Sequence, residues 1–278
     1  MKKIAILNIK NFIVSNLNQM LTESEIQYDL NFFDDYNKEI NCYNKKYITK
    51  GLHEFDETEY DIILNLSTMV EKVNLTDNQI YLAFDERLQY FDKDNAVKHY
   101  NIIPSCLGPL LNILDVFKKD LVSFDLIVNR SVASNGIEAM HSFFRESKDH
   151  SIQTVYKGHF FDEALIYNLH LKENDLKINI APVKYNIKIL QTSVIKVNTL
   201  IFYITFNKEI EEKEFIKRMD ELDIEYKENI DAIKMDNEDY VVASGFKKLY
   251  DNKYSFLITF DDLRCGAAKY IYDIINQG

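Results

Sequence analysis

The stretch Lys3–Leu21, KIAILNIKNFIVSNLNQML, decides the fold class of the chain. Its apolar run Ile4–Leu7 predicts a buried strand, and the amphipathic stretch Phe12–Ser24 that follows a polar turn predicts a helix. Nucleotide-binding α/β domains open with this order of strand, loop and helix. The loop of such a domain carries two or three glycines, and this loop has none. The stretch therefore predicts a Rossmann-type domain with an altered nucleotide loop.

Strand-like and helix-like patterns alternate over the first hundred or so residues. Short apolar runs are separated by polar stretches, and Glu86–Asn95 has the pattern of a helix. Alternation of this kind favours a parallel sheet with crossover helices. The further strands that we predict here are Tyr28–Phe33, Asp61–Leu66, Gln79–Phe84 and Asn101–Pro104.

From about Cys106 onward, long strand-like runs follow one another with few helices between them. Such runs indicate an antiparallel or mixed sheet, and hence an α+β second domain. The chain closes on an amphipathic helix, Leu263–Asn276, with Asp261 and Asp262 as favourable charges at its start. The other elements predicted in this half are helices at Leu107–Lys119 and Asn135–Glu146 and strands at Asp125–Asn129, Leu176–Pro182, Tyr185–Val197, Leu200–Asn207, Tyr240–Lys247 and Lys253–Phe260.

Composition limits the class of protein. A chain of 278 residues, 46% apolar and 28% charged, has the size of two globular domains. Its net charge of −11 argues against nucleic-acid binding, because phosphate contacts need clustered Lys and Arg. No apolar run has the length of a membrane span and the start lacks a signal-peptide pattern, so we expect no membrane insertion and a cytoplasmic location. The three cysteines are not spaced like metal ligands, so we expect reduced thiols and no metal site.

The C-terminal stretch Phe260–Ile275, FDDLRCGAAKYIYDII, is the most specific string in the chain. It closely resembles the D-N-L-R-K-G-A-A start of the last helix in aspartate-semialdehyde dehydrogenases. Other segments resemble motifs of that family in the same order. They are Ile6–Ser15 for the G-A-T-G-A-V-G loop, Ile102–Leu111 for the N-P-N-C-S/T nucleophile segment, Val128–Gly136 for T-Y-Q-A-x-S-G-A-G, Ile166–Leu169 for A-F-N-x-I-P and Lys184–Ser193 for R-V-P-V-x-x-G-H-S.

This resemblance implies a fold of two domains. Residues 1–104 and 261–278 would form a Rossmann-type dinucleotide-binding domain that the C-terminal helix completes. Residues 105–260 would form a central α+β dimerisation domain, through which the chain would make a homodimer. The implied reaction is the reductive dephosphorylation of an acyl phosphate through a thioester, with NADPH as the hydride donor.

The dinucleotide loop departs from the family pattern. In the register of the resemblance, Asn8, Asn11 and Val14 replace the three glycines. Glycine there permits a tight turn, close approach of the backbone to the pyrophosphate, and close packing of the helix on the strand. Asparagine tolerates a left-handed backbone, but the branched side chain of Val14 conflicts with close packing. We therefore expect that binding of NADP, the cofactor of the family, is lost and that the chain uses no cofactor.

The catalytic positions implied by the resemblance are altered as well. Cys106 falls on the nucleophile, but Gln191 stands where the family has its histidine base, and glutamine cannot exchange a proton near neutral pH. Ser131 stands where the family has its active-site glutamine, with Arg130 one residue earlier as an alternative register. Lys184 replaces the substrate-binding arginine, whose bidentate contact with a carboxylate lysine cannot make.

Three further features bear on the implied site. Arg264 keeps the arginine of the last-helix motif, a substrate-binding position. The interval between Asn168 and Lys184 is short, whereas the family has an additional helix there that carries substrate and phosphate ligands. His159 and His170 flank Ile166–Leu169 and could replace the missing base.

Three functions remain open on the sequence. The first is a catalytically inactive aspartate-semialdehyde dehydrogenase-like protein that acts as a dimeric scaffold for an unidentified protein partner. The second is a divergent semialdehyde dehydrogenase or acyl-transferring oxidoreductase with Cys106 as its nucleophile. The third is a regulatory module that binds a small ligand in the remaining cleft. The joint loss of loop glycines and base beside a retained scaffold favours the first.

Overall fold

The computed structural model describes residues 1–8, 12–42, 45–66, 73–76, 78–85, 88, 98–151, 160–161, 165, 169–172 and 183–277. The chain divides into two compact units: unit 1 is Met1–Ile103 with Ala267–Gly278, and unit 2 is Pro104–Gly266. The sequence-based boundaries were 104/105 and 260/261. The C-terminal boundary lies instead at 266/267, so residues 261–266 belong to unit 2.

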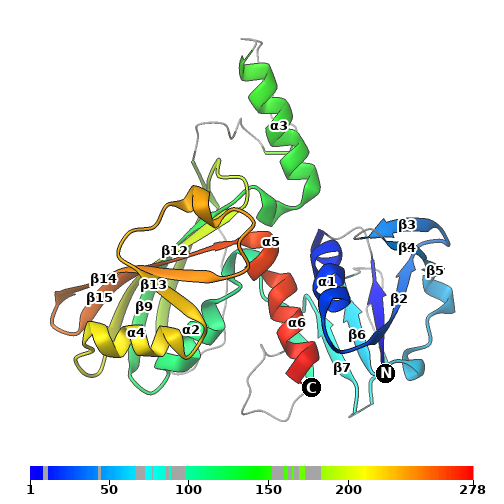
Figure 1. Cartoon of the computed structure of the whole chain (residues 1–278), viewed down its shortest axis with the longest axis horizontal. Coiled ribbons are helices and arrows are strands. Elements are labelled where there is room, and N and C mark those ends of the chain that lie inside the picture. Colours follow the sequence, from blue (N-terminus) through cyan, green and yellow to red (C-terminus); the bar gives the residue numbers. More distant parts are fainter. Residues whose placement is uncertain are drawn as a thin grey trace. The chain divides into compact units, whose positions relative to one another are not determined.

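Unit 1 is built on a parallel sheet whose described strands run in the order β5-β2-β1-β6-β7-β8 (Figure 1). β2 pairs with one edge of β1, and β6 pairs with the other. In doubly wound sheets, this reversal of strand order marks the edge at which dinucleotides bind. The strands are β1 (Lys2–Leu7), β2 (Tyr28–Asp34), β5 (Lys50–Gly51), β6 (Ile62–Asn65), β7 (Ile80–Ala83) and β8 (His99–Asn101).

Both faces of the unit 1 sheet are covered, as a parallel sheet requires. Residues 4–7 of β1 have no exposed surface. The helices α1 (Phe12–Glu23) and α6 (Ala267–Gln277) contact each other and share a core with Ile4 and Ile6 on one face. On the other face Phe33 packs edge-on against Tyr60, with ring centroids 5.8 Å apart.

A short hairpin after β2 was not predicted from the sequence. It consists of β3 (Glu39–Cys42) and β4 (Lys45–Ile48). Tyr47 packs edge-on against Phe32, with ring centroids 4.7 Å apart, and its hydroxyl donates a hydrogen bond of 3.2 Å to Asn18 of α1. The hairpin therefore belongs to the helix-covered side of unit 1.

Unit 2 holds a mixed sheet in the order β10-β11-β9-β12-β15-β14-β13, which confirms the antiparallel or mixed sheet expected for this half. β9 runs parallel to β11 and β14 runs parallel to β13, whereas the other neighbours are antiparallel. The strands are β9 (Leu121–Arg130), β10 (His170–Lys172), β11 (Lys184–Gln191), β12 (Val197–Phe206), β13 (Ile224–Lys227), β14 (Val241–Tyr250) and β15 (Lys253–Asp261).

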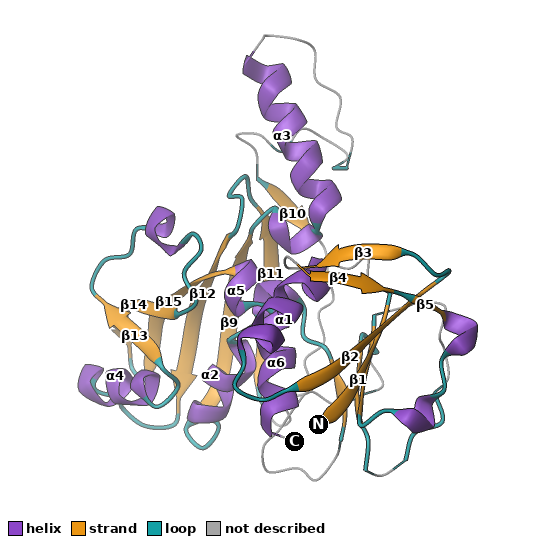
Figure 2. Ribbon diagram, turned by 45° about the vertical axis from the view of Figure 1, so that its right-hand side comes forward, coloured by secondary structure: helices purple, strands orange, loops and turns teal. Residues whose placement is uncertain are grey.

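Two helices, α2 (Leu110–Phe117) and α4 (Glu212–Asp220), lie against this sheet (Figure 2). Aromatic rings join them to the strands. Phe117 of α2 lies 5.0 Å from Phe206, and Phe215 of α4 lies 4.9 Å from Phe256, measured between ring centroids. These rings are fully or almost fully buried, so this face of the sheet holds the core of unit 2.

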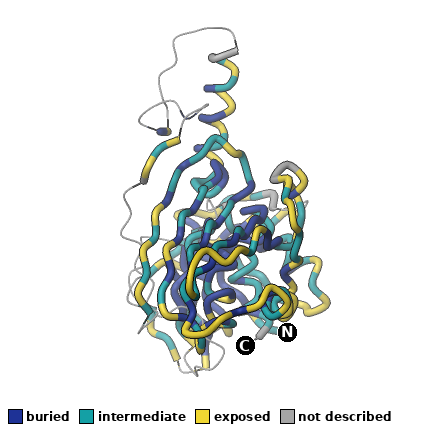
Figure 3. The backbone as a smooth tube through the Cα atoms, turned by 90° about the vertical axis from the view of Figure 1, so that its left-hand side faces the viewer, coloured by how far each residue is buried: buried dark blue, intermediate teal, exposed yellow. Residues whose placement is uncertain are grey.

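The strands of unit 2 alternate between this core and the opposite face, and Figure 3 shows the resulting change of burial along the backbone. On β12, Phe202 and Ile204 have no exposed surface, whereas Ile201, on the opposite face of the strand, is half-buried. Ile201 is paired with Ile127 of β9 and Leu257 of β15, which are also half-buried. These three side chains form an apolar row on the face opposite α2 and α4, because directly paired residues share a face.

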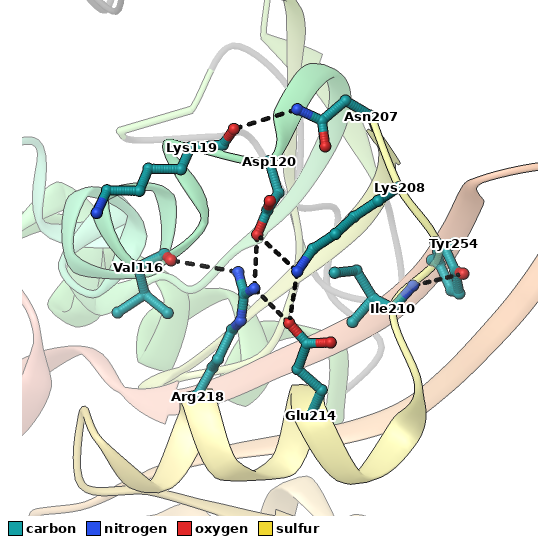
Figure 4. Close-up of polar contacts among 9 residues, drawn as sticks. All are labelled: Val116, Lys119, Asp120, Asn207, Lys208, Ile210, Glu214, Arg218 and Tyr254. Atoms are coloured by element: carbon teal, nitrogen blue, oxygen red, sulfur yellow. Dashed lines mark hydrogen bonds and ion pairs between the residues drawn. The ribbon is translucent and has the colours of Figure 1, made fainter.

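A group of ion pairs fixes α4 to the start of β9 (Figure 4). Arg218 donates to Asp120 and to Glu214, both at 2.5 Å. Its guanidinium carbon lies 5.0 Å from the ring centroid of Phe117, a cation–π distance. Lys208 completes the group at 3.0 Å from Glu214.

Several predicted bounds are wrong for reasons beyond local sequence. The strand expected over Tyr185–Val197 ends at Gln191, and a turn separates it from β12. The helix expected over Leu263–Asn276 is broken at Gly266 into α5 (Asp262–Cys265) and α6. The helix expected over Leu107–Lys119 begins at Leu110, after the 3-10 turn η3 (Ser105–Leu107), and α3 spans Ile137–Ser151 in place of Asn135–Glu146.

Other predictions lie beyond the described residues or missed an element. The helix Glu86–Asn95, except Leu88, and the strand Leu176–Pro182 fall outside the described residues. α4 and β13 were not predicted. Among the residues that the structure describes, no helix is long and apolar enough to cross a membrane.

Candidate functional site

Cys106 lies in η3, directly before α2, with 1% of its surface exposed. Burial raises the pKa of its thiol to about 12, the nearby Arg130 guanidinium lowers it and the Asp262 carboxylate raises it further. Burial outweighs the favourable charge of Arg130. The thiol is therefore protonated at neutral pH, and a protonated thiol is a poor nucleophile.

Asp262, the first residue of α5, is the central acceptor beside Cys106. Its carboxylate is 3% exposed and accepts a hydrogen bond of 2.5 Å from the Asn198 amide. Burial raises the pKa of Asp262 to about 6, while hydrogen bonds from Ser134, Asn198 and Ser105 and the charge of Arg130 oppose the rise. A buried carboxylate with this many donors is fixed in place.

Two serines continue the network behind Asp262. The Asn198 side-chain oxygen accepts from the backbone N–H of Ser131 at 2.7 Å and from the Ser134 hydroxyl at 3.2 Å. The two serine hydroxyls lie 3.2 Å apart. We refer to the connected group as the Cys106 cluster: Ser105, Cys106, Arg130, Ser131, Ser134, Gln191, Asn198 and Asp262.

Gln191, the position of the family's base, is built into this cluster as a structural amide. It has no exposed surface. Its amide nitrogen lies at 3.1 Å from the carbonyl of Arg130 and at 3.2 Å from those of Ser131 and Thr192, and its oxygen accepts from the Asn135 amide at 2.6 Å. Gln191 therefore joins the end of β9 to the turn that leads into α3.

Arg130, the last residue of β9, supplies the positive charge of the cluster. Its Nη2 donates to the carbonyl of Ser134 at 2.8 Å. Its Nε is buried and has no hydrogen-bond partner among the residues that the structure describes. The guanidinium acts on both Cys106 and Asp262. Arg130, the alternative to Ser131 at the position of the family's active-site glutamine, therefore also lies inside the cluster.

His170 lies beside Gln191. The two are directly paired across β10 and β11, and side chains of such pairs lie on the same face at about 5 Å between their Cβ atoms. The structure therefore places one of the two histidines named from the sequence on the strand next to the position of the missing base. His159 lies outside the described residues.

Two glycines hold η3 against α5. A Cβ atom on Gly266 would lie 2.2 Å from the Ser105 hydroxyl and 2.3 Å from the carbonyl oxygen of Asp262. A Cβ atom on Gly108 would lie 2.3 Å from the carbonyl oxygen of Cys265. Glycine at both positions lets the two segments meet backbone to backbone, and this contact brings Ser105 and Cys106 to Asp262.

The remaining residues predicted for the site are not members of the Cys106 cluster. Lys184 is exposed at the first residue of β11, roughly 23 Å along the strand from Gln191 at 3.3 Å per residue, so it does not join the cluster. Arg264 lies half-buried in α5, and its backbone N–H donates to Asp261 at 3.3 Å. Asp261 is the N-cap of α5, which confirms its expected role at a helix start.

In unit 1, Asn8 occupies the reversal point of the sheet. Its φ of 69° lies in the left-handed region that favours glycine. Its backbone N–H donates to Phe33 at 3.0 Å and its side-chain amide donates to the carbonyl of Leu66 at 3.1 Å. Val14 is 2% exposed in the core of α1 and α6, and Asn11 lies outside the described residues.

The sequence reading overlooked Asp34, the last residue of β2. An acid at the end of this strand holds the ribose hydroxyls in dinucleotide-binding domains. Here it is 3% exposed, forms an ion pair of 2.5 Å with Lys38 and accepts from the Asp35 N–H at 2.9 Å. The signal available in the sequence was an acidic residue directly after the second apolar strand.

Similarity to known proteins is found at the level of structure. No family model matches the sequence, and no curated protein matches it. Solved aspartate-semialdehyde dehydrogenase structures match the whole chain. The enzyme II from Vibrio cholerae, complexed with ASA, matches with a TM-score of 0.82 at 11% identity, covering 100% of this chain and 98% of that one. A probable aspartate-semialdehyde dehydrogenase from Pseudomonas aeruginosa gives 0.81 at 11%, covering 99% and 97%.

A third structure, the aspartate-semialdehyde dehydrogenase from Francisella tularensis, gives a TM-score of 0.79 at 10% identity and covers 99% of both chains. The chain therefore has the two-domain fold of aspartate-semialdehyde dehydrogenases, which confirms the fold implied by the motifs. Within the described residues, no group of three or more His, Cys, Asp or Glu side chains is arranged to hold a metal ion.

Proposed function

We propose that this chain is a catalytically inactive protein of aspartate-semialdehyde dehydrogenase fold that serves as a dimeric scaffold. The observation that carries the proposal is the bonding of Gln191. An amide that already contacts three carbonyl groups and accepts from Asn135 cannot take a proton from a thiol. The thiol it would serve, Cys106, is itself buried and protonated.

Loss of the dinucleotide is the second part of the proposal. The Asn8 side chain joins the ends of β1 and β6, where a pyrophosphate would approach. Asp34, where a ribose would bind, is engaged by Lys38. Titration with NADPH, followed by the fluorescence of the nicotinamide, is the direct test. We expect no saturation up to about 1 mM, whereas a micromolar dissociation constant would contradict the proposal.

Thiol kinetics test the inactive site itself. A pKa of about 12 against an ordinary value of 9.0 lowers the thiolate fraction about a thousandfold at neutral pH. We expect iodoacetamide to label Cys106 at least a thousand times more slowly than free cysteine at pH 7, as measured by peptide mass spectrometry. Labelling of Cys106 as fast as free cysteine, together with turnover of an acyl phosphate or an aldehyde, would contradict the proposal.

The homodimer is proposed to form through the apolar row of Ile127, Ile201 and Leu257. Exposed Asp125 and Lys188 flank this row on the same face, so two copies related by a twofold axis could pair opposite charges around an apolar centre. Sedimentation of an Ile201→Glu variant tests this surface.

We expect the Ile201→Glu variant to sediment as a monomer. The matched control is Leu249→Glu, an apolar-to-acidic change at an exposed position of β14. A dimeric Ile201→Glu variant, or a monomeric control, would argue against this interface. The protein partner of the scaffold would be identified by affinity capture with the wild-type chain, and it is expected to bind the control variant equally well.

One observation favours the alternative, a divergent oxidoreductase that uses Cys106. His170 lies beside Gln191 and could serve as the base that the family supplies from the adjacent strand. Under this alternative, His170→Ala would shift the pH profile of Cys106 alkylation. Under the scaffold proposal, the profile would not change.

A further inference from the structure

Residues 230–240, which we call the strap, cross one end of the unit 2 sheet. Met235 packs with Val197 of β12 and Val242 of β14, and Ile230 and Tyr240 pack against the same cluster. Of the strap side chains that the structure describes, Met235 alone is buried. Segments with little buried apolar surface open at a lower free energy than the core they cover.

Polar contacts fasten the strap around Asp236, Asn237 and Glu238. Lys196 lies 2.8 Å from the carboxylate of Asp236 and 2.8 Å from the side-chain oxygen of Asn237. Asn237 has a left-handed backbone, with φ of 68°, and this conformation turns its N–H toward Asp261 at 2.8 Å. A further contact joins the strap to α5, because the Cys265 thiol donates to the carbonyl of Glu238 at 4.0 Å.

Asp261 holds two elements at once. One carboxylate oxygen accepts from Asn237 of the strap, and the other caps α5 through the N–H groups of Leu263 and Arg264 at 2.8 and 3.3 Å. The next residue, Asp262, is the central acceptor of the Cys106 cluster. Release of the strap thus removes a constraint from the turn that positions Asp262.

We propose that the strap is a releasable cover, coupled through Asp261 to α5, and that its opening exposes Cys106. A strap that leaves Asp261 frees that carboxylate to reorient, and α5 then loses the cap that holds it against η3. This inference goes beyond the proposed function, because it holds whether or not Cys106 takes part in a reaction.

The test is the rate at which native protein is labelled at Cys106 by iodoacetamide at pH 8, with each cysteine followed by peptide mass spectrometry. We expect Asn237→Ala, which strains the turn and removes the contact with Lys196, to raise the rate about tenfold. Asp261→Asn should also raise it, because an amide nitrogen in place of one carboxylate oxygen cannot accept from the Asn237 N–H, while the remaining oxygen can still cap α5. Asn237→Gly, which accepts the left-handed backbone, should give a smaller increase than Asn237→Ala.

The matched control is Arg218→Ala, which removes ion pairs at α4 and leaves the strap contacts in place. If it speeds Cys106 labelling as much as Asn237→Ala for the same loss of global stability, exposure requires global unfolding and the coupling is refuted. Hydrogen exchange gives the second measurement. The amides of Asn237, Leu263 and Arg264 should exchange faster together in Asn237→Ala, and faster exchange of Asn237 alone would also overturn the coupling.

Discussion

Replacing Gly266 by alanine tests whether the backbone contact between η3 and α5 builds the Cys106 cluster. The new Cβ would meet the Ser105 hydroxyl at 2.2 Å and the Asp262 carbonyl oxygen at 2.3 Å. To bring the second contact to an ordinary 3.4 Å, backbone must move by about 1 Å, because a carbonyl cannot rotate away as a side chain can.

The expected cost follows from these contacts. Overpacking of this kind costs about 1–3 kcal/mol, and the backbone contact places Gly266→Ala toward the upper end, at about 3 kcal/mol. The lower chain entropy of unfolded alanine returns about 0.5 kcal/mol. We therefore expect the free energy of unfolding to fall by about 2.5 kcal/mol, measured by equilibrium denaturation in urea with circular dichroism.

Two variants make the result decisive. Gly245→Ala is the control, because its Cβ meets nothing within 4 Å and only its φ of 63° is unfavourable, which costs about 1 kcal/mol. Ser105→Ala in the Gly266→Ala background removes one of the two short contacts and should restore part of the loss. If Gly266→Ala costs no more than Gly245→Ala, the steric reasoning is refuted.

Three further changes have expected outcomes. Asn8→Ala should lower the free energy of unfolding by about 1 kcal/mol more than Asn8→Gly, because both variants lose the bond to Leu66 and only alanine is strained by the left-handed φ. Equal losses in urea would contradict this. Folding raises the pKa of Asp262 from 3.8 to about 6, so the protonated carboxyl stabilises the fold at low pH and this stabilisation is lost as the pH rises. The free energy of unfolding of wild type should therefore fall by about 3 kcal/mol relative to Asp262→Asn between pH 3.5 and 7. A constant difference between the two in urea would refute the shift. Arg218→Ala should lower the free energy of unfolding by about 2 kcal/mol, whereas Lys248→Ala, which breaks an exposed ion pair, should cause no measurable loss. Comparable losses would count against the half-buried network.

The sequence correctly predicted features that depend on neighbouring residues along the chain. The strand Ile4–Leu7 and the capping carboxylate of Asp261 follow from periodicity and from the preference of helix starts for acidic residues. The left-handed tolerance of asparagine, inferred for the loop, is realised at Asn8. In each case the neighbours that matter lie within a few residues along the chain.

The misses depend on contacts between distant segments. The break at Gly266 follows from its approach to Ser105, which lies far away in the sequence. Gln191 reads as a lost base, but its bonds to Asn135 and to the carbonyl groups at the end of β9 require the pairing of β11 with β9. The proximity of His170 to Gln191 likewise requires the β10–β11 pairing. A single sequence does not encode these pairings in any local pattern.

The discontinuity of unit 1 has a practical consequence for protein engineering. A chain cut after Ile103 would lack α6, and with it Ile271, Ile274 and Ile275 from the core that α1 shares. The two ends of the unit are nevertheless close, since the Tyr270 hydroxyl donates to the carbonyl of Asn101 at 3.2 Å. A short glycine-serine linker from residue 103 to residue 267 would excise unit 2 and leave a minimal Rossmann-type protein, suited to screening loop grafts that restore nucleotide binding.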